Sequence, residues 1–302
     1  MEEDAGFHSS FLFTGERREI AINSAGIPLT IHHPLNATKG TVLIVPGWSG
    51  PRSGPADILV YFAANLARSG WTAIRMDLPA RGDASGDFIN CGLDEMIDAT
   101  IKTAATCGGM PISYLLGMCS GSNVSLGVAT RLKQKIHQDP EACDNRLANN
   151  VAVIALSALP FQPSRSPSFD RLRRWKNIKQ YAAKATSPQT WARLLKGDID
   201  MRRVKKNVTS SEAPTGGGRN LKDSARDIER ELLGWKASAL FVWGGGDEEA
   251  PPARAHYEKL HEAGMGTPGK TYFCMVDGAN HNFYSQAWRE ELFSKIIDFI
   301  AK

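Results

Sequence analysis

The sequence predicts an α/β protein with a mostly parallel sheet of eight strands and helices on both faces. From Arg18 onward, short apolar runs alternate with longer amphipathic runs, which is the pattern of strands joined by crossover helices. The chain has 302 residues and is 42% hydrophobic, enough for one large core. Two strand-like runs precede the first helical run, so we expect the sheet to open with a hairpin.

The individual elements follow from this alternation. In the last helical run, apolar side chains recur every three or four residues and form one stripe for packing on the sheet, at Trp288, Leu292, Ile296 and Phe299. We expect strands at 19–24, 28–33, 41–46, 72–77, 112–118, 151–157, 239–243 and 270–276. We expect helices at 56–69, 93–106, 122–137, 252–263 and 286–301.

Residues 160–236 interrupt the alternation with sequence rich in Pro, Ser, Arg and Lys. Residues 161–236 carry 18 Lys and Arg against 8 Asp and Glu, a net charge of +10, in a chain whose formal charge is +4. Long excursions in a compact domain are usually functional. We therefore expect a core made of 1–159 and 237–302 and a basic helical cap over 160–236, with helical pieces at 169–183, 188–195 and 221–233. A solvated surface excursion is the alternative.

Composition and charge exclude several classes of protein. The five cysteines are odd in number, irregularly spaced and without a CxxC pair, which argues against a disulfide framework and against a zinc site. No cofactor or metal is expected. The N-terminus is acidic, and no stretch approaches the roughly 20 apolar residues of a membrane span, so we expect a cytoplasmic protein without a span. Nucleic-acid binding would explain only the basic stretch.

The most informative motif is Gly117-Met118-Cys119-Ser120-Gly121, which directly follows an apolar strand and precedes a helical run. Flanking glycines allow the close backbone approach of a sharp turn between a strand and a helix. The motif therefore predicts a nucleophile elbow with Cys119 at its tip, at the carboxyl edge of the sheet. The alternative is a small buried core cysteine.

A catalytic thiol needs a base within hydrogen-bond reach. Of the seven histidines, His281 fits best, because it lies in a turn-rich loop after the last predicted strand, at the same edge of the sheet. Asp247 follows the preceding strand and is placed to accept Nδ1–H of that histidine. Glu249 lies close by and leaves the choice of carboxylate open. Nucleophile, acid and histidine then follow one another in the order expected for this topology.

An oxyanion needs two donors, and two backbone groups are candidates. The first is the N–H of Ser120, the residue after the nucleophile. The second is the N–H of Trp48, in the loop that follows the third predicted strand. In a further loop, over 77–86, we expect Arg81 and Asp83 to tie loops together.

These motifs together resemble the α/β-hydrolase superfamily. They are the Pro-Gly-Trp loop at 46–48, the Asp-x-x-x-Arg-Gly-Asp-x-Ser loop at 77–85, the elbow, and the Asp and His loops. The likeness covers nearly the whole chain apart from the N-terminal arm and the cap. The cysteine nucleophile is similar to that of dienelactone hydrolases and polyhydroxyalkanoate synthases. The loop at 46–52 resembles that of exosortase-associated, serine-aminopeptidase-like hydrolases.

The resemblance implies acyl transfer through an acyl-Cys119 intermediate, with His281 and Asp247 completing a triad. The first expectation is a cysteine-dependent hydrolase of esters or thioesters. An acyltransferase is the second, since the basic cap would favour the phosphates of coenzyme A or an acidic acyl-carrier protein. A non-catalytic binding protein that keeps the fold is the third. The sequence leaves the acyl chain, the acceptor, the pathway and the oligomeric state open.

Overall fold

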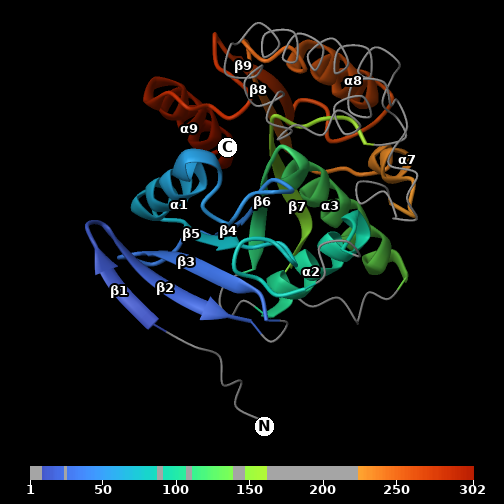
Figure 1. Ribbon diagram of the computed structural model, residues 1–302. Coiled ribbons are helices and arrows are strands. Elements are labelled where there is room, and N and C mark those ends of the chain that lie inside the picture. Colours follow the sequence, from blue (N-terminus) through green and yellow to red (C-terminus); the bar gives the residue numbers. More distant parts are fainter. Residues whose placement is uncertain (1–8, 24–25, 87–90, 107–110, 139–146, 162–223) are drawn as a thin grey trace, which may run out of the picture.

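The computed structural model describes residues 9–23, 26–86, 91–106, 111–138, 147–161 and 224–302. They form one sheet flanked by helices on both faces (Figure 1). All eight predicted strands are present, and a ninth, β1, extends the sheet at its N-terminal edge. The strand order is β1-β2-β3-β5-β4-β6-β7-β8-β9.

The strands and helices have the following bounds. The strands are β1 (Ser9–Phe13), β2 (Glu16–Ile22), β3 (Pro28–Pro34), β4 (Thr41–Val45), β5 (Thr72–Met76), β6 (Ile112–Met118), β7 (Leu147–Leu156), β8 (Ala239–Gly244) and β9 (Thr271–Val276). The α-helices are α1 (Ile58–Arg68), α2 (Leu93–Thr106), α3 (Ser120–Gln138), α7 (Ile228–Leu232), α8 (Ala250–Glu262) and α9 (Gln286–Ile300).

The sheet is antiparallel at one end and parallel over the rest. Strands β1, β2, β3 and β5 pair antiparallel in turn, whereas β5, β4, β6, β7, β8 and β9 all run in the same direction. From β4 the chain moves to β5 on one side and then returns to β6 on the other. Ligands bind at such a switch point, outside the carboxyl ends of the strands. The crevice therefore lies beyond β4 and β6.

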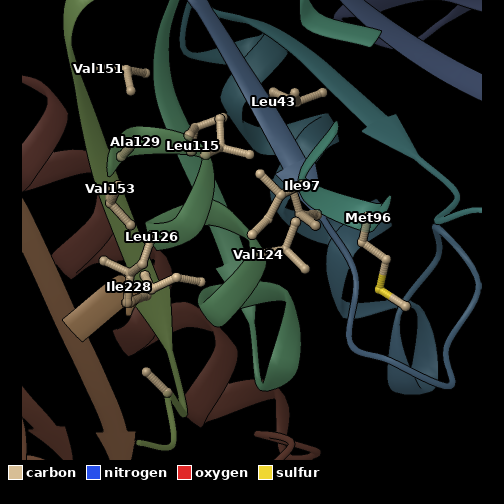
Figure 2. Close-up of a cluster of buried hydrophobic side chains, with 14 of the residues drawn as sticks. Leu43, Met96, Ile97, Leu115, Val124, Leu126, Ala129, Val151, Val153 and Ile228 are labelled. Carbon is tan, nitrogen blue, oxygen red and sulfur yellow. The ribbon is translucent and has the colours of Figure 1, made fainter. Parts of the chain in front are cut away.

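Alternate residues of the central strands pack on opposite faces of the sheet, because successive strand side chains point in opposite directions. In β4, Leu43 belongs to the core under α2, α3 and α8, whereas Val42 and Ile44 belong to the core under α1 and α9. Figure 1 shows the two groups of helices on the two sides. Figure 2 shows the first core, in which Leu115 of β6 and Val153 of β7 lie among side chains of α2 and α3. These two cores fix the loops at the carboxyl edge.

The first helix starts later than the sequence pattern predicts. Helix α1 begins at Ile58 rather than at residue 56, because Ala56 and Asp57 have φ values of 49° and 58° in the left-handed region.

Of the predicted cap pieces, those at 169–183 and 188–195 lie outside the described residues. The piece at 221–233 contains α7, and the carboxylate of Asp227 accepts a hydrogen bond from the N–H of Arg230 at its start. Among the helices that the structure describes, none has both the length and the hydropathy needed to cross a membrane.

Candidate active site

Cys119 occupies a strained backbone position between β6 and α3. Its φ is 55°, in the left-handed region that costs a side-chain-bearing residue about 1–3 kcal/mol. The turn is fixed to the end of β7, because the N–H of Cys119 donates to the carbonyl oxygen of Leu156 at 2.7 Å. The buried hydroxyl of Ser122 has two possible acceptors, the carbonyl oxygens of Gly117 and Leu156, at 2.9 and 3.0 Å. The predicted sharp turn is therefore present.

The two glycines of the motif are required by backbone contacts. A Cβ added to Gly117 would lie 2.3 Å from the carbonyl oxygen of Gly121. One added to Gly121 would lie 2.4 Å from the carbonyl oxygens of Val45 and Pro46, at the end of β4. The elbow therefore packs directly against the strand that leads into the predicted oxyanion loop.

His281 lies beside both predicted partners. Its Nδ1 is 2.6 Å from Oδ2 of Asp247, whose side chain is almost fully buried, and its side chain also hydrogen-bonds Cys119. The other oxygen of Asp247 accepts the N–H of Glu249 at 3.1 Å. The carboxylate that contacts the histidine is thus Asp247, and Glu249 contributes its backbone to the same turn.

The electrostatics of His281 favour the imidazolium. Burial alone would lower the pKa of His281, but its hydrogen bonds to Asp247 and Cys119 and the negative charge of both groups outweigh burial and raise that pKa to about 10. An imidazole with this pKa keeps its proton at neutral pH. The imidazolium of His281 therefore lies between the carboxylate of Asp247 and the sulfur of Cys119.

Ser157, which no sequence motif marks, supports the histidine loop. The hydroxyl of Ser157, directly after β7, donates to the carbonyl oxygen of His281 at 2.8 Å. Ser157 is fully buried and has a φ of 48°. A polar residue immediately after a buried strand of a parallel sheet is the signal that could have indicated this contact.

The predicted oxyanion donors lie next to each other, but one of them is already engaged. The N–H of Trp48 donates to Oγ of Ser120, with 2.5 Å between nitrogen and oxygen. Arg81 holds the same loop, because its Nε donates to the carbonyl oxygen of Trp48 at 3.1 Å and its guanidinium lies 4.5 Å from the centroid of the Trp48 ring. The guanidinium of Arg52 joins Asp77 and Asp83. The expectation that Arg81 and Asp83 tie loops together is confirmed.

A cavity of about 410 Å³ opens above the elbow. Its described lining comes from the loop after β4, the elbow, the start of α2 and α3, the segment after β7 and the histidine loop. None of these lining residues is Asp, Glu, Lys or Arg. They are Gly47, Trp48, Ser49, Gly50, Pro51, Gly54, Pro55, Leu93, Met118, Cys119, Ser120, Asn123, Leu159, Pro160, Phe161 and Asn282.

Three possible metal ligands lie at the same edge of the sheet. One ligand atom each from Asp247, Glu249 and His281 lies within 4.8 Å of the others. The 2.6 Å between Oδ2 of Asp247 and Nδ1 of His281 is a hydrogen-bond distance, and that bond uses Nδ1. The arrangement fits a histidine oriented by a carboxylate.

Comparison with known proteins identifies the fold. No protein-family model matches the chain, and no curated protein sequence matches it. Solved structures do match. Alpha/beta hydrolase domain-containing protein 10 from mouse has 15% identity and a TM-score of 0.53, with 98% of each chain covered. The thioesterase domain from the curacin biosynthetic pathway has 13% identity and a TM-score of 0.55, with 97% of this chain and 100% of that one covered.

A dienelactone hydrolase from Anabaena variabilis ATCC 29413 is similar to the same extent. It has 12% identity and a TM-score of 0.55, with 97% of each chain covered. At such identities the likeness concerns the fold. The protein has the α/β-hydrolase fold, and the expected fold class is confirmed, with nine strands where eight were predicted.

Proposed function

We propose that the protein is a cysteine-dependent acyl hydrolase, acting on esters or thioesters through an acyl-Cys119 intermediate. One observation carries the proposal: His281 hydrogen-bonds Cys119 and Asp247 together, at an elbow that opens into a cavity. Three residues far apart in the sequence meet there in the arrangement used by nucleophile, base and orienting acid. The solved structures with this fold include proteins described as a thioesterase and as a dienelactone hydrolase.

In the acylation step, the imidazolium and the sulfur act as a pair. A raised pKa at His281 keeps the proton on the ring. An imidazolium beside a cysteine favours the thiolate, so the proposed nucleophile is the thiolate of Cys119. The thiolate attacks the substrate carbonyl carbon, a carbon–sulfur bond forms, and the carbonyl π electrons move to oxygen. When the carbonyl re-forms, the bond to the leaving group breaks, and His281 gives its proton to the departing alkoxide or thiolate.

Deacylation reverses the roles. The neutral ring of His281 takes a proton from water, the hydroxide attacks the thioester carbon, and the carbon–sulfur bond breaks. The acid product leaves, and Cys119 is again a thiolate beside an imidazolium. Asp247 keeps Nδ1 protonated throughout, so that the other ring nitrogen faces the reaction.

The cavity favours an uncharged acyl group. Leu93, Leu159 and Phe161 give it apolar walls, and Asn123 and Asn282 are polar but neutral. A carboxylate or phosphate brought into this part of the cavity would lose hydration without gaining a cationic partner among the described lining residues. We therefore infer a neutral acyl group of modest size, and the charged part of a carrier would lie outside the cavity.

The basic segment 161–236 favours a second candidate, an acyltransferase. Its net charge of +10 suits the phosphates of coenzyme A or an acidic carrier protein, and a thioester intermediate reacts readily with amines and thiols. We propose that 160–236 forms a cap over the site. A cytoplasmic location, which would keep Cys119 reduced, stays a prediction.

Covalent trapping tests the proposed function. Incubation with a p-nitrophenyl ester should add one acyl group to the wild type, as measured by intact mass, and peptide mapping should place it on Cys119. Cys119→Ala should show no adduct. Cys274→Ala, which removes another partly buried thiol, serves as the control and should acylate like the wild type. Equal adduct in Cys119→Ala, or none in the wild type, would remove the proposed mechanism and favour a binding protein.

Product analysis separates the two enzyme candidates. The acylated enzyme is chased in water alone and in the presence of amine, alcohol or thiol acceptors. A hydrolase releases free acid at a rate that the acceptors leave unchanged. An acyltransferase forms the acceptor ester, amide or thioester and hydrolyses slowly in its absence.

A further inference from the structure

The hydroxyl of Ser120 lies between the nucleophile and the loop expected to hold the oxyanion. It accepts the hydrogen bond of the Trp48 N–H at 2.5 Å. A Cβ added to Gly47 would lie 3.7 Å from Cβ of Cys119 and 3.9 Å from Oγ of Ser120, so the hydroxyl and the nucleophile border the same narrow space. Trp48, Cys119 and Ser120 all line the cavity.

The hydrogen bond from Trp48 to Ser120 reduces the number of backbone N–H groups available to a substrate. The amide of Trp48 has one proton, and that proton is directed at Ser120. An oxyanion-binding site (oxyanion hole) built from the backbone N–H groups of Ser120 and Trp48 would therefore lack one of its two donors in this arrangement. A hydroxyl has two lone pairs and one proton of its own. Within the described part of the chain, no group accepts that proton of the Ser120 hydroxyl.

We propose that Ser120 is a catalytic residue whose side-chain hydroxyl, together with its own N–H, donates to the oxyanion. The proposal rests on the proposed acyl transfer. As Cys119 attacks and the carbonyl π electrons move to oxygen, that oxygen receives hydrogen bonds from Oγ–H and N–H of Ser120, and no proton is transferred. The Trp48 amide acts through the hydroxyl, because a hydroxyl that accepts a hydrogen bond becomes a stronger donor.

The position of Ser120 in the fold supports a role in binding negative charge. It is the first residue of α3, a helix of 19 residues, and the backbone N–H groups at a helix start favour an anion. The side chain is partly exposed, so the hydroxyl is accessible from the cavity. If the hydroxyl instead only occupied the Trp48 amide, its removal would free the Trp48 N–H to bind the oxyanion, and acylation would become faster.

Two reactions of the same thiol separate these roles. Acylation by a p-nitrophenyl ester forms an oxyanion, whereas alkylation by iodoacetamide displaces iodide at a saturated carbon and forms none. Ser120→Ala should slow acylation by about 10- to 100-fold. This is less than the roughly 10²- to 10³-fold cost of a lost oxyanion donor, because the Trp48 amide is released to compensate. The loss should appear in the saturating rate and leave KM unchanged. The alkylation rate should stay within about twofold.

Ser120→Thr provides the matched control, since it keeps a hydroxyl at the same position and should acylate much faster than Ser120→Ala. Acylation of Ser120→Ala as fast as the wild type, or faster, would overturn the proposal, and so would an equal loss of alkylation and acylation. A wild type that forms no acyl adduct would instead refute the proposed function. Circular dichroism of each variant checks that α3 and its neighbours are folded.

Discussion

Two histidine–carboxylate pairs in this molecule have the same geometry but differ in the charge of the imidazole ring. In the candidate site, Nδ1 of His281 lies 2.6 Å from a carboxylate oxygen of Asp247. At the antiparallel end of the sheet, Nδ1 of His32 lies 2.6 Å from a carboxylate oxygen of Glu16. The pKa of His281 is raised to about 10, whereas the pKa of His32 is lowered to about 4.

The difference comes from burial and from the second partner of each ring. His32 is fully buried, which lowers its pKa, and Nε of Arg75 donates to its Nε2 at 3.0 Å, so that nitrogen must act as an acceptor. The side chain of His281 is 25% exposed, and its second partner is the thiol of Cys119. A cation beside the ring keeps it neutral, and an acidic group beside it keeps it charged.

The comparison teaches that a carboxylate beside a histidine does not by itself indicate catalysis. The pair of His32 and Glu16 lies within the sheet and joins β2 to β3 and, through Arg75, to β5. The pair of His281 and Asp247 lies at the carboxyl edge of the sheet, beside a nucleophile and a cavity. The first pair should serve stability and the second activity, and variants of each can separate these effects.

The largest expected effect is on activity, from the variant Asp247→Asn. The asparagine fits the same space, but it no longer fixes the tautomer or stabilises the imidazolium, so kcat should fall by about 10³- to 10⁴-fold, the scale known for triad acids. Glu249→Gln is the matched control and should keep most of the activity, because Glu249 contributes a backbone N–H. Similar losses in both variants would refute the assignment of the acid.

A smaller effect concerns stability against acid. Because the folded pKa of His32 lies below its unfolded value near 6.5, its contribution to stability is present above pH 6.5 and is lost as pH falls through about 4. The shift corresponds to a loss on the order of 3 kcal/mol. Urea unfolding of the wild type and of His32→Gln across this range should show a steeper acid loss in the wild type. Parallel curves would contradict the lowered pKa.

The parts of the fold that repeat a simple pattern could be predicted from the sequence. The eight runs expected as strands are all strands. In the parallel part of the sheet, burial on both faces leaves continuous apolar stretches, as in β4 and β8, which are buried throughout. The elbow was predictable because its glycines are needed where backbones touch. Strand β1 was missed, because its residues do not alternate and its Phe11 and Leu12 side chains are exposed at the edge. Gly15, with a φ of 82°, was the turn signal before β2.

Contacts that depend on side-chain placement across loops could not be predicted. The order along the chain indicated that Cys119, Asp247 and His281 share one edge of the sheet. It did not indicate that Oγ of Ser120 would accept the amide of Trp48, since that requires the spacing of two loops separated by 72 residues. The position of Ser157 after a buried strand could have marked it as a candidate, but its partner in the His281 loop could not be predicted, because the two follow different strands, β7 and β9, and share no motif.

The protonation of His281 decides whether Cys119 and His281 form an activated pair. Its ring signals are followed by NMR from pH 5 to 11 in the wild type and in Cys119→Ala, and His281→Gln assigns them. We expect an imidazolium that persists through neutral pH in the wild type, with a pKa of about 10. In Cys119→Ala, where the hydrogen bond and charge of Cys119 are absent, we expect a lower pKa of His281. A wild-type ring that titrates near pH 6.5, unchanged by loss of the thiol, would contradict an activated cysteine–histidine pair.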